Sequence, residues 1–260
     1  FIAGLDWGIR GAAIATGLGY SVTAVVGLIV FAKKNNLLHF TKPVFRLRVL
    51  WEAAANGSSE MATSLVTGIV TMMFNSTMLR YAGEDGVAAV TIIMYVLMFV
   101  SSLYTGYSYG VAPMISYCYG EQRSDKLKKL VGISLKIIAL ISLFSTLISF
   151  GITEKMVSIF TQPDNAVYAL AVTGNRICSI ALLFIGFNIF ASGMFTALSN
   201  GFLSAVLAFS RSFVFMAASM LILPKMFGIA GVGFATPAAE LTALCLSAAI
   251  FFSNKKRYCY

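Results

Sequence analysis

The sequence predicts an all-α polytopic membrane protein with about seven transmembrane helices, one from a first repeat and six from a complete second repeat. Of the 260 residues, 58% are hydrophobic and 11% are charged, whereas a soluble domain has roughly 25% charged residues. The apolar stretches reach about 20 residues, enough to cross a ~30 Å hydrocarbon core as helices. They also lack the alternation of barrel strands. A nine-residue segment that occurs twice, called the repeated phrase below, indicates the repeat.

The repeated phrase opens one apolar run near each end of the chain. Residues 8–16 and 228–236 share five of nine positions at an offset of 220. Duplicated halves are common in secondary transporters, where the substrate path runs between them. We therefore expect a fragment in which most of the first repeat is missing. Residues 1–50 would be the last helix of an N-terminal lobe with a cytoplasmic inter-lobe loop, and residues 51–260 the six-helix C-terminal lobe.

Seven stretches are apolar and long enough to be membrane spans. The third is expected to continue as a helix to about Tyr119. In chain order the predicted spans are residues 11–32, 56–79, 87–110, 130–152, 172–196, 202–223 and 229–252.

Loop charges orient the chain. Twelve lysine and arginine residues follow the first, third and seventh spans, and four lie on the opposite side. We therefore expect a multi-pass protein of the cell membrane, and the positive-inside rule places its C-terminus in the cytoplasm. Contact between these cations and anionic lipid accounts for the net charge of +9 without a nucleic-acid partner.

The residues do not predict an enzyme, a cofactor site or a metal site. The single histidine, His39, lies among basic loop residues, and the four cysteines lack the spacing of metal ligands. There is no nucleophile with a base nearby in the sequence, and no glycine-rich phosphate loop after a strand. A proton or a sodium ion, acting as a coupling ion, is the only small ion that we expect the protein to use.

Ionisable residues inside the spans are the candidate site, because such groups are costly in a membrane and tend to face a cavity or a partner. Glu60, beside Asn56 in a small polar cluster, would line a wet pocket that holds a proton or cation, or would be a helix-entry carboxylate facing water. Glu240 follows Pro237 by three residues and would bind an ion or pair with a buried arginine. Arg211 lies deep in an apolar span and requires a carboxylate partner, Glu240 or Glu60.

Four separated motifs resemble one transporter family. They are Asn56-Gly57-Ser58-Ser59-Glu60, Ala112-Pro113-Met114-Ile115-Ser116-Tyr117-Cys118-Tyr119-Gly120, Phe195-Thr196-Ala197-Leu198-Ser199-Asn200-Gly201 and Pro237-Ala238-Ala239-Glu240. Together they resemble the multidrug and toxic compound extrusion (MATE) family, in particular the bacterial branch of staphylococcal multidrug exporters and DinF-like proteins. The resemblance spans essentially the whole chain.

The resemblance implies a twelve-helix protein of two six-helix lobes that exports organic cations and other toxic compounds, driven by inward flow of protons or sodium. Glu60 matches an acid of the seventh helix that is tied to cation coupling in part of the family. Asn188 falls where the sodium-coupled branch has an aspartate in the tenth helix, which puts a sodium site in this lobe in doubt. In the DinF-like branch, coupling is assigned to an aspartate of the first helix, outside this sequence.

The resulting hypothesis is an antiporter that exchanges organic cations or drugs for protons or sodium, with membrane lipid and the missing N-terminal lobe as partners. Glu60 would bind the coupling ion or the drug, while Arg211 with Glu240 would set local charge or hold the lobe together. A flippase for lipid-linked precursors is the alternative, and it would require a more basic central cavity. The repeat disfavours a seven-helix receptor, and no pore-loop motif supports a channel.

Overall fold

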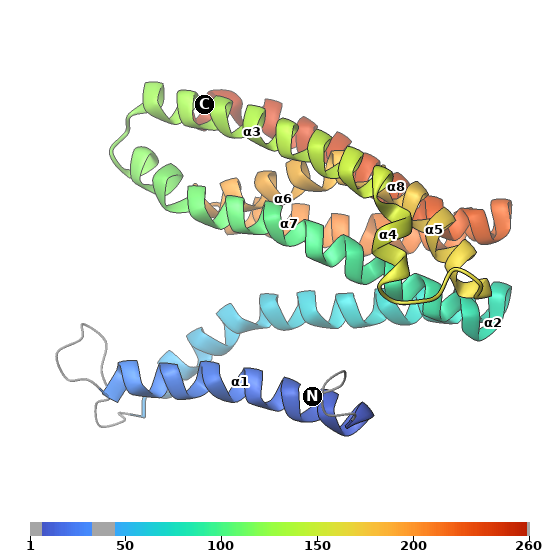
Figure 1. The fold of residues 1–260 in the computed structure, drawn as a ribbon. Coiled ribbons are helices and arrows are strands. Elements are labelled where there is room, and N and C mark those ends of the chain that lie inside the picture. The colour runs from blue at the N-terminus through green and yellow to red at the C-terminus, as the bar shows by residue number, and fades with distance from the viewer. Residues whose placement is uncertain (1–6, 33–44, 259–260) are drawn as a thin grey trace. The chain divides into compact units, whose positions relative to one another are not determined.

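The computed structural model describes residues 7–32 and 45–258, apart from the side chains of residues 12, 23, 49, 51–64, 256 and 257. Helices make up nearly all of this part of the chain, which contains no strand (Figure 1). The elements are α1 (Gly8–Ala32), α2 (Leu47–Gly120), α3 (Ser124–Gly151), α4 (Thr153–Ser158), α5 (Ala166–Ser179), α6 (Leu182–Ala197), α7 (Gly201–Phe209), the π-helix η1 (Ser210–Phe215) and α8 (Met216–Tyr258).

The chain divides into two compact units, Phe1–Ala55 and Asn56–Tyr260. The first unit contains α1, which is apolar and whose described side chains are almost all exposed. A helix that is hydrophobic on all sides is typical of a membrane span. The assignment of α1 to a separate N-terminal lobe stays a prediction. The second unit contains most of α2 and all later elements.

Two helices of the second unit are interrupted by a glycine. The backbone leaves the helical conformation at Gly83 in α2 (φ 64°, ψ −153°) and at Gly228 in α8 (φ 59°, ψ −134°). Glycine has no Cβ and adopts positive φ without the steric cost that other residues pay. Figure 1 shows the chain reversing direction at each of these breaks. Each break therefore separates two helical segments that run in different directions.

The predicted fold class is confirmed. By length and composition, four helical stretches of the described residues could cross a membrane. A fifth is added if α5 and α6, which the sequence predicted as one unbroken span and which are bent by 52°, cross as one broken span. Two of these stretches, Leu65–Gly120 and Gly201–Lys255, have 56 and 55 residues and would exceed ~80 Å if straight. Because Gly83 and Gly228 divide them, the described residues contain the seven predicted spans. The third span continues as a helix to Gly120, as expected.

Side-chain contacts define the two ends of the second unit. At one end the rings of Tyr119 and Tyr258 lie 5.8 Å apart, and the Asn200 amide donates to the Tyr258 hydroxyl at 2.7 Å. At the other end the Tyr81 hydroxyl donates to the Pro224 carbonyl at 3.0 Å. The turns after α2 and α6 thus share one end with the C-terminal turn of α8, and the glycine breaks lie at the opposite end.

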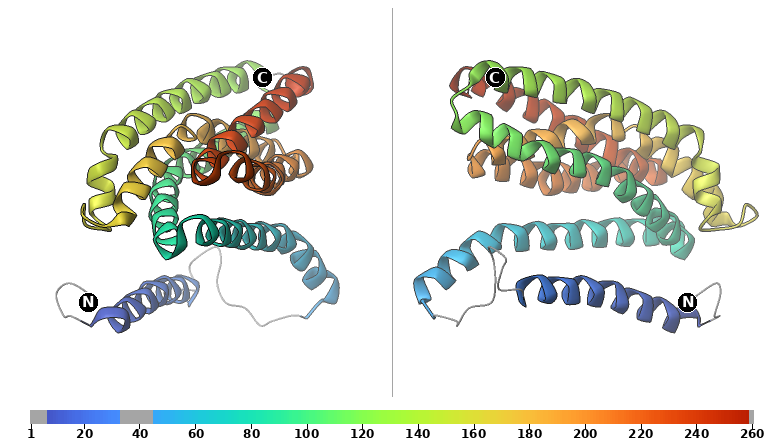
Figure 2. Two further views of the ribbon diagram at one scale, coloured as in Figure 1. Left: turned by 90° about the vertical axis from the view of Figure 1, so that its right-hand side faces the viewer. Right: turned by 60° about the vertical axis from the view of Figure 1, so that its left-hand side comes forward.

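The core of the second unit is built around α6, which packs against α3, α7 and α8. Figure 2 shows the red second half of α8 beside α6 from two further directions. Phe190, Met194 and Phe195 of α6 are at most 2% exposed. A Cβ at Gly186 would lie only 2.8 Å from the Tyr104 ring. Small residues let membrane helices approach closely, and this packing fixes the position of the polar residues on α6.

Candidate functional site

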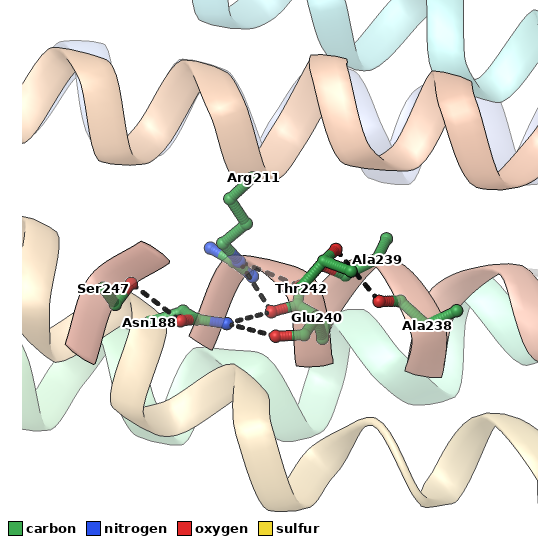
Figure 3. A network of polar contacts seen from close by, with 7 residues as sticks. All are labelled: Asn188, Arg211, Ala238, Ala239, Glu240, Thr242 and Ser247. Atoms are coloured by element: carbon green, nitrogen blue, oxygen red, sulfur yellow. Dashed lines mark hydrogen bonds and ion pairs between the residues drawn. The ribbon is translucent and has the colours of Figure 1, made fainter. Parts of the chain in front are cut away.

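Arg211 and Glu240 form an ion pair within the second unit. Nε of Arg211 donates to both carboxylate oxygens of Glu240, at 2.8 Å and 3.0 Å (Figure 3). Arg211 lies in η1, a π-helical turn between α7 and α8. Such turns are rare and often occur at functional sites. The predicted arginine-carboxylate contact therefore involves Glu240.

Asn188 of α6 joins this pair to a third helix. Its Nδ2 donates to Oε2 of Glu240 at 2.8 Å and to the Glu240 backbone carbonyl at 2.9 Å. Its Oδ1 accepts a hydrogen bond from the Ser247 hydroxyl at 2.9 Å. Both ends of the amide are thus engaged (Figure 3). We refer to Asn188, Arg211, Glu240 and Ser247 as the polar network.

The polar network is buried on the side of α6 and α8. Glu240 is 4% exposed and Asn188 is 2% exposed, whereas the Arg211 side chain is 24% exposed. A buried carboxylate without a partner is strongly unfavourable, and a paired, hydrogen-bonded one is tolerated. The network therefore neutralises Glu240 and ties α6, η1 and α8 together.

Sequence analysis did not include Ser247 in the site. It follows Glu240 by seven residues, which places both on one face of a helix. This spacing was the one feature of the sequence that could have indicated Ser247 as a site residue. The contact with Asn188 depends on how α6 packs against α8, which the sequence does not reveal.

The two other candidates, Asn56 and Glu60, lie in α2, where the structure describes their backbone only. Their side chains lie outside the described residues. Their predicted role in binding a coupling ion or a drug stays a prediction.

Pro237 frees a backbone carbonyl close to the network. Proline has no N–H, so the carbonyl four residues earlier, that of Gly233, loses its helical partner. The Cys178 thiol of α5 donates to this oxygen at 3.4 Å. This contact gives the freed carbonyl a partner and links α5 to α8.

A second candidate region is an open, mostly apolar groove of about 690 Å³ formed by the two halves of α2 around Gly83. Glu84 is its single ionisable residue, and the neighbouring Asp85 does not line it. Met72 and Leu79 supply apolar walls, and Asn75 supplies an amide. We refer to this region as the Glu84 groove. Glu84 falls between the predicted spans 56–79 and 87–110, and sequence analysis missed the groove because it exists only when α2 folds back at Gly83.

The described residues hold no group of three or more histidine, cysteine, aspartate or glutamate side chains placed to bind a metal ion. Among the acidic residues, Glu84 lines the groove and Glu240 belongs to the polar network.

Comparison with known proteins gives one family and one fold. The family model MatE matches residues 60–221. The multidrug export protein MepA of Staphylococcus saprophyticus is 22% identical over 251 residues, covering 96% of this chain and 54% of that protein. MepA of Staphylococcus haemolyticus is 24% identical and covers 98% of this chain and 56% of its own length. The chain thus spans about half the length of the curated relatives it matches.

Solved structures share the fold at low sequence identity. One is the outward-facing conformation of a multidrug resistance MATE family transporter of the MOP superfamily, with a TM-score of 0.79 at 23% identity, covering 99% of this chain and 58% of that chain. Another is a MOP superfamily transporter from Pyrococcus furiosus, for which reverse polarity of the binding pocket suggests a different function. Its TM-score is 0.76 at 21% identity, covering 98% of this chain and 59% of that chain.

Proposed function

This chain belongs to the MatE family, and from that membership we propose that the whole protein is a multidrug efflux antiporter. It exports lipophilic organic cations across the cell membrane and is driven by inward flow of protons or sodium. The chain described above supplies the C-terminal lobe, and another lobe of the same protein supplies the facing half of the substrate path. The proposal is one of transport, without catalysis.

The Glu84 groove is the observation that carries the choice of cations. A single carboxylate lies there among apolar and amide side chains, with Met72 exposed by 73% and Leu79 by 55%. Methionine packs adaptably against ligands of different shapes, and one negative charge favours a cation over an anion. This combination suits lipophilic cations that share a charge but differ in shape.

We assign a structural role to the polar network. Asn188 uses its amide on Glu240 and Ser247, so it does not offer a free oxygen to sodium in this conformation. Arg211 neutralises Glu240, so this carboxylate is not the preferred cation site either. Glu60 remains the proposed coupling acid, with Asn56 beside it.

Orientation follows from the distribution of basic residues. Arg123 and the lysines in the first turns of α3, Lys126, Lys128 and Lys129, share one end of the second unit with Lys255. The contact between Tyr119 and Tyr258 lies at the same end. We propose that this end and the C-terminus face the cytoplasm, where the cations meet anionic lipid headgroups.

A flippase for anionic lipid-linked precursors is the alternative. It would require a basic cavity, and Arg211, the cation deepest in the predicted spans, is paired with Glu240. The charge in the Glu84 groove is negative. Both features favour the cation exporter over the flippase. Membership of a transporter family disfavours the seven-helix receptor.

The test is efflux of a fluorescent lipophilic cation from vesicles that contain the full-length protein. A proton gradient and a sodium gradient are imposed separately, for the wild type and for Glu60→Gln. We expect one gradient to drive efflux and the Glu60 variant to lose most of it. Efflux that survives in the variant would move coupling to the other lobe, and absence of efflux under both gradients would contradict the exporter.

A further inference from the structure

A second cavity, separate from the Glu84 groove, lies inside the second unit. It has a volume of about 390 Å³, within the range of roughly 300–1,000 Å³ that is usual for small-molecule sites. Both halves of α2, together with α5 and α8, form its walls. Phe74 and Val232 are buried deep in the cavity, and exposed Thr173 and Ala230 form part of its rim. The cavity is therefore accessible from outside the lobe.

The lining of this cavity is almost entirely apolar and includes no side chain that carries a charge at neutral pH. Its polar side chains are Thr173, Thr236 and Cys178, and the Cys178 thiol is already engaged with the Gly233 carbonyl. Apolar cavities stay dry and accept apolar guests, as shown by the benzene bound in an engineered cavity of roughly 150 Å³. A charged group would lose its hydration here without gaining a partner.

The cavity adjoins the polar network. Thr236 lines the cavity and precedes Glu240 by four residues, so both lie on one face of α8, a single turn apart. Met216 also lines the cavity and follows Arg211 by five residues, the spacing of one π-helical turn. A molecule in the cavity would therefore contact α8 directly after η1 and again one turn before Glu240.

We propose that this cavity is a binding site for uncharged apolar small molecules, with room for a substituted benzene and for somewhat larger molecules. It is distinct in chemistry and place from the Glu84 groove, to which cations are assigned. Occupancy fills space beside η1 and α8 and so stabilises the packing around the ion pair. The site does not depend on which substrate the protein exports.

The first test is a diffraction experiment on crystals of the full-length protein soaked in bromobenzene. The anomalous signal of bromine locates the molecule directly. We expect a peak within contact distance of Phe74 and Val232. Bromine found only on the lipid-facing surface, with no peak in the cavity, would overturn the proposal.

Variants show whether the cavity itself holds the ligand. Val232→Phe fills the interior, and Ala230→Phe blocks the exposed rim with little risk to folding. Val214→Phe is the matched control, because Val214 is 46% exposed and does not line the cavity. We expect the bromine peak to be lost in the first two variants and kept in the control. A peak that persists in both filled variants would refute the assignment.

A solution measurement removes the dependence on crystals. A ligand that binds the folded state raises the unfolding temperature. In lipid nanodiscs, toluene should raise the unfolding temperature of the wild type and of Val214→Phe relative to Val232→Phe and Ala230→Phe. Equal shifts in all four proteins would indicate an effect of toluene on the lipid and would contradict a specific site.

Discussion

The two copies of the repeated phrase begin in the same way. Gly8 has φ 51° and Gly228 has φ 59°, and α1 begins at the first while the second half of α8 follows the second. Both glycines occupy the left-handed region, which other residues rarely adopt. Nine residues of similar sequence thus set the same local structure in two separate units.

The same two copies differ in burial at their last two positions. Ala15 and Thr16 are exposed, whereas Ala235 is 0% exposed and Thr236 is 7% exposed. Tyr20 is 77% exposed, and Glu240, 220 residues later, is 4% exposed. The second copy belongs to a unit in which α5, α6 and η1 pack against α8. Local sequence therefore decides where the helix begins, and tertiary partners decide what it buries.

Among the variants considered, removal of the Arg211 side chain should lower the unfolding free energy most. Arg211→Leu leaves the Glu240 carboxylate buried without a cation, and the loss of a partner from a buried ion pair costs about 3–5 kcal/mol of unfolding free energy. Lys136→Leu is the control, because this cation of α3 is exposed. We expect it to change stability by about 0.5 kcal/mol or less.

The measurement is denaturant or thermal unfolding of the full-length protein in detergent. The double variant Arg211→Leu with Glu240→Leu should recover much of the loss, because it removes both charges. Equal stability of Arg211→Leu and Lys136→Leu would mean that the ion pair does not hold the lobe together.

A methyl group at Gly231 should have the next largest effect. Its Cβ would lie 2.1 Å from the Leu223 carbonyl oxygen and 2.8 Å from the Pro224 nitrogen, so backbone would have to move. Overpacking of this kind typically costs about 1–3 kcal/mol. At Gly233 a Cβ would meet only the Ile177 side chain, at 3.4–3.6 Å.

Gly231→Ala should therefore lower the unfolding temperature clearly, and Gly233→Ala should lower it little. The two variants differ by two positions on one helix and carry the same added methyl group. Indistinguishable unfolding temperatures would show that the close contact at the Gly228 break is not formed.

The smallest effect is expected at the two positive-φ glycines, and it should be equal in both copies. A Cβ at Gly8 or Gly228 meets nothing within 4 Å, so only backbone strain of roughly 1–2 kcal/mol opposes alanine. Gly17→Ala has the same open surroundings at a helical φ and should stabilise by about 0.5–1 kcal/mol. The measurement is the unfolding temperature of the three alanine variants. A gain in stability for Gly228→Ala would contradict the claim that both copies begin at a glycine with positive φ.

Sequence analysis predicted the membrane spans well because the bilayer imposes length and hydropathy on each helix. The predicted span 229–252 begins directly after the Gly228 break, and the span 11–32 ends with α1 at Ala32. The site was less accessible. The partner of Arg211 stayed open between two acids, because only the packing of η1 on α8 selects Glu240.

The Glu84 groove was beyond sequence analysis for a related reason. Residues between the second and third predicted spans looked like a loop, and the non-helical backbone at Gly83 is what turns Glu84 toward the preceding segment of α2. Hydropathy detects the two spans on either side but carries no information on the angle between them. The cavity beside Thr236 escaped notice for the same reason, since its walls come from both halves of α2, from α5 and from both halves of α8.

The most direct test of the proposed exporter is binding of a fluorescent lipophilic cation to the full-length protein, comparing Glu84→Gln with Asp85→Asn. The two variants remove adjacent negative charges, but Glu84 lines the groove and Asp85 does not. We predict an affinity at least about tenfold weaker for Glu84→Gln, equivalent to about 1.4 kcal/mol, and nearly unchanged for Asp85→Asn. Equal affinities in the two variants would contradict the assignment of the groove to cations.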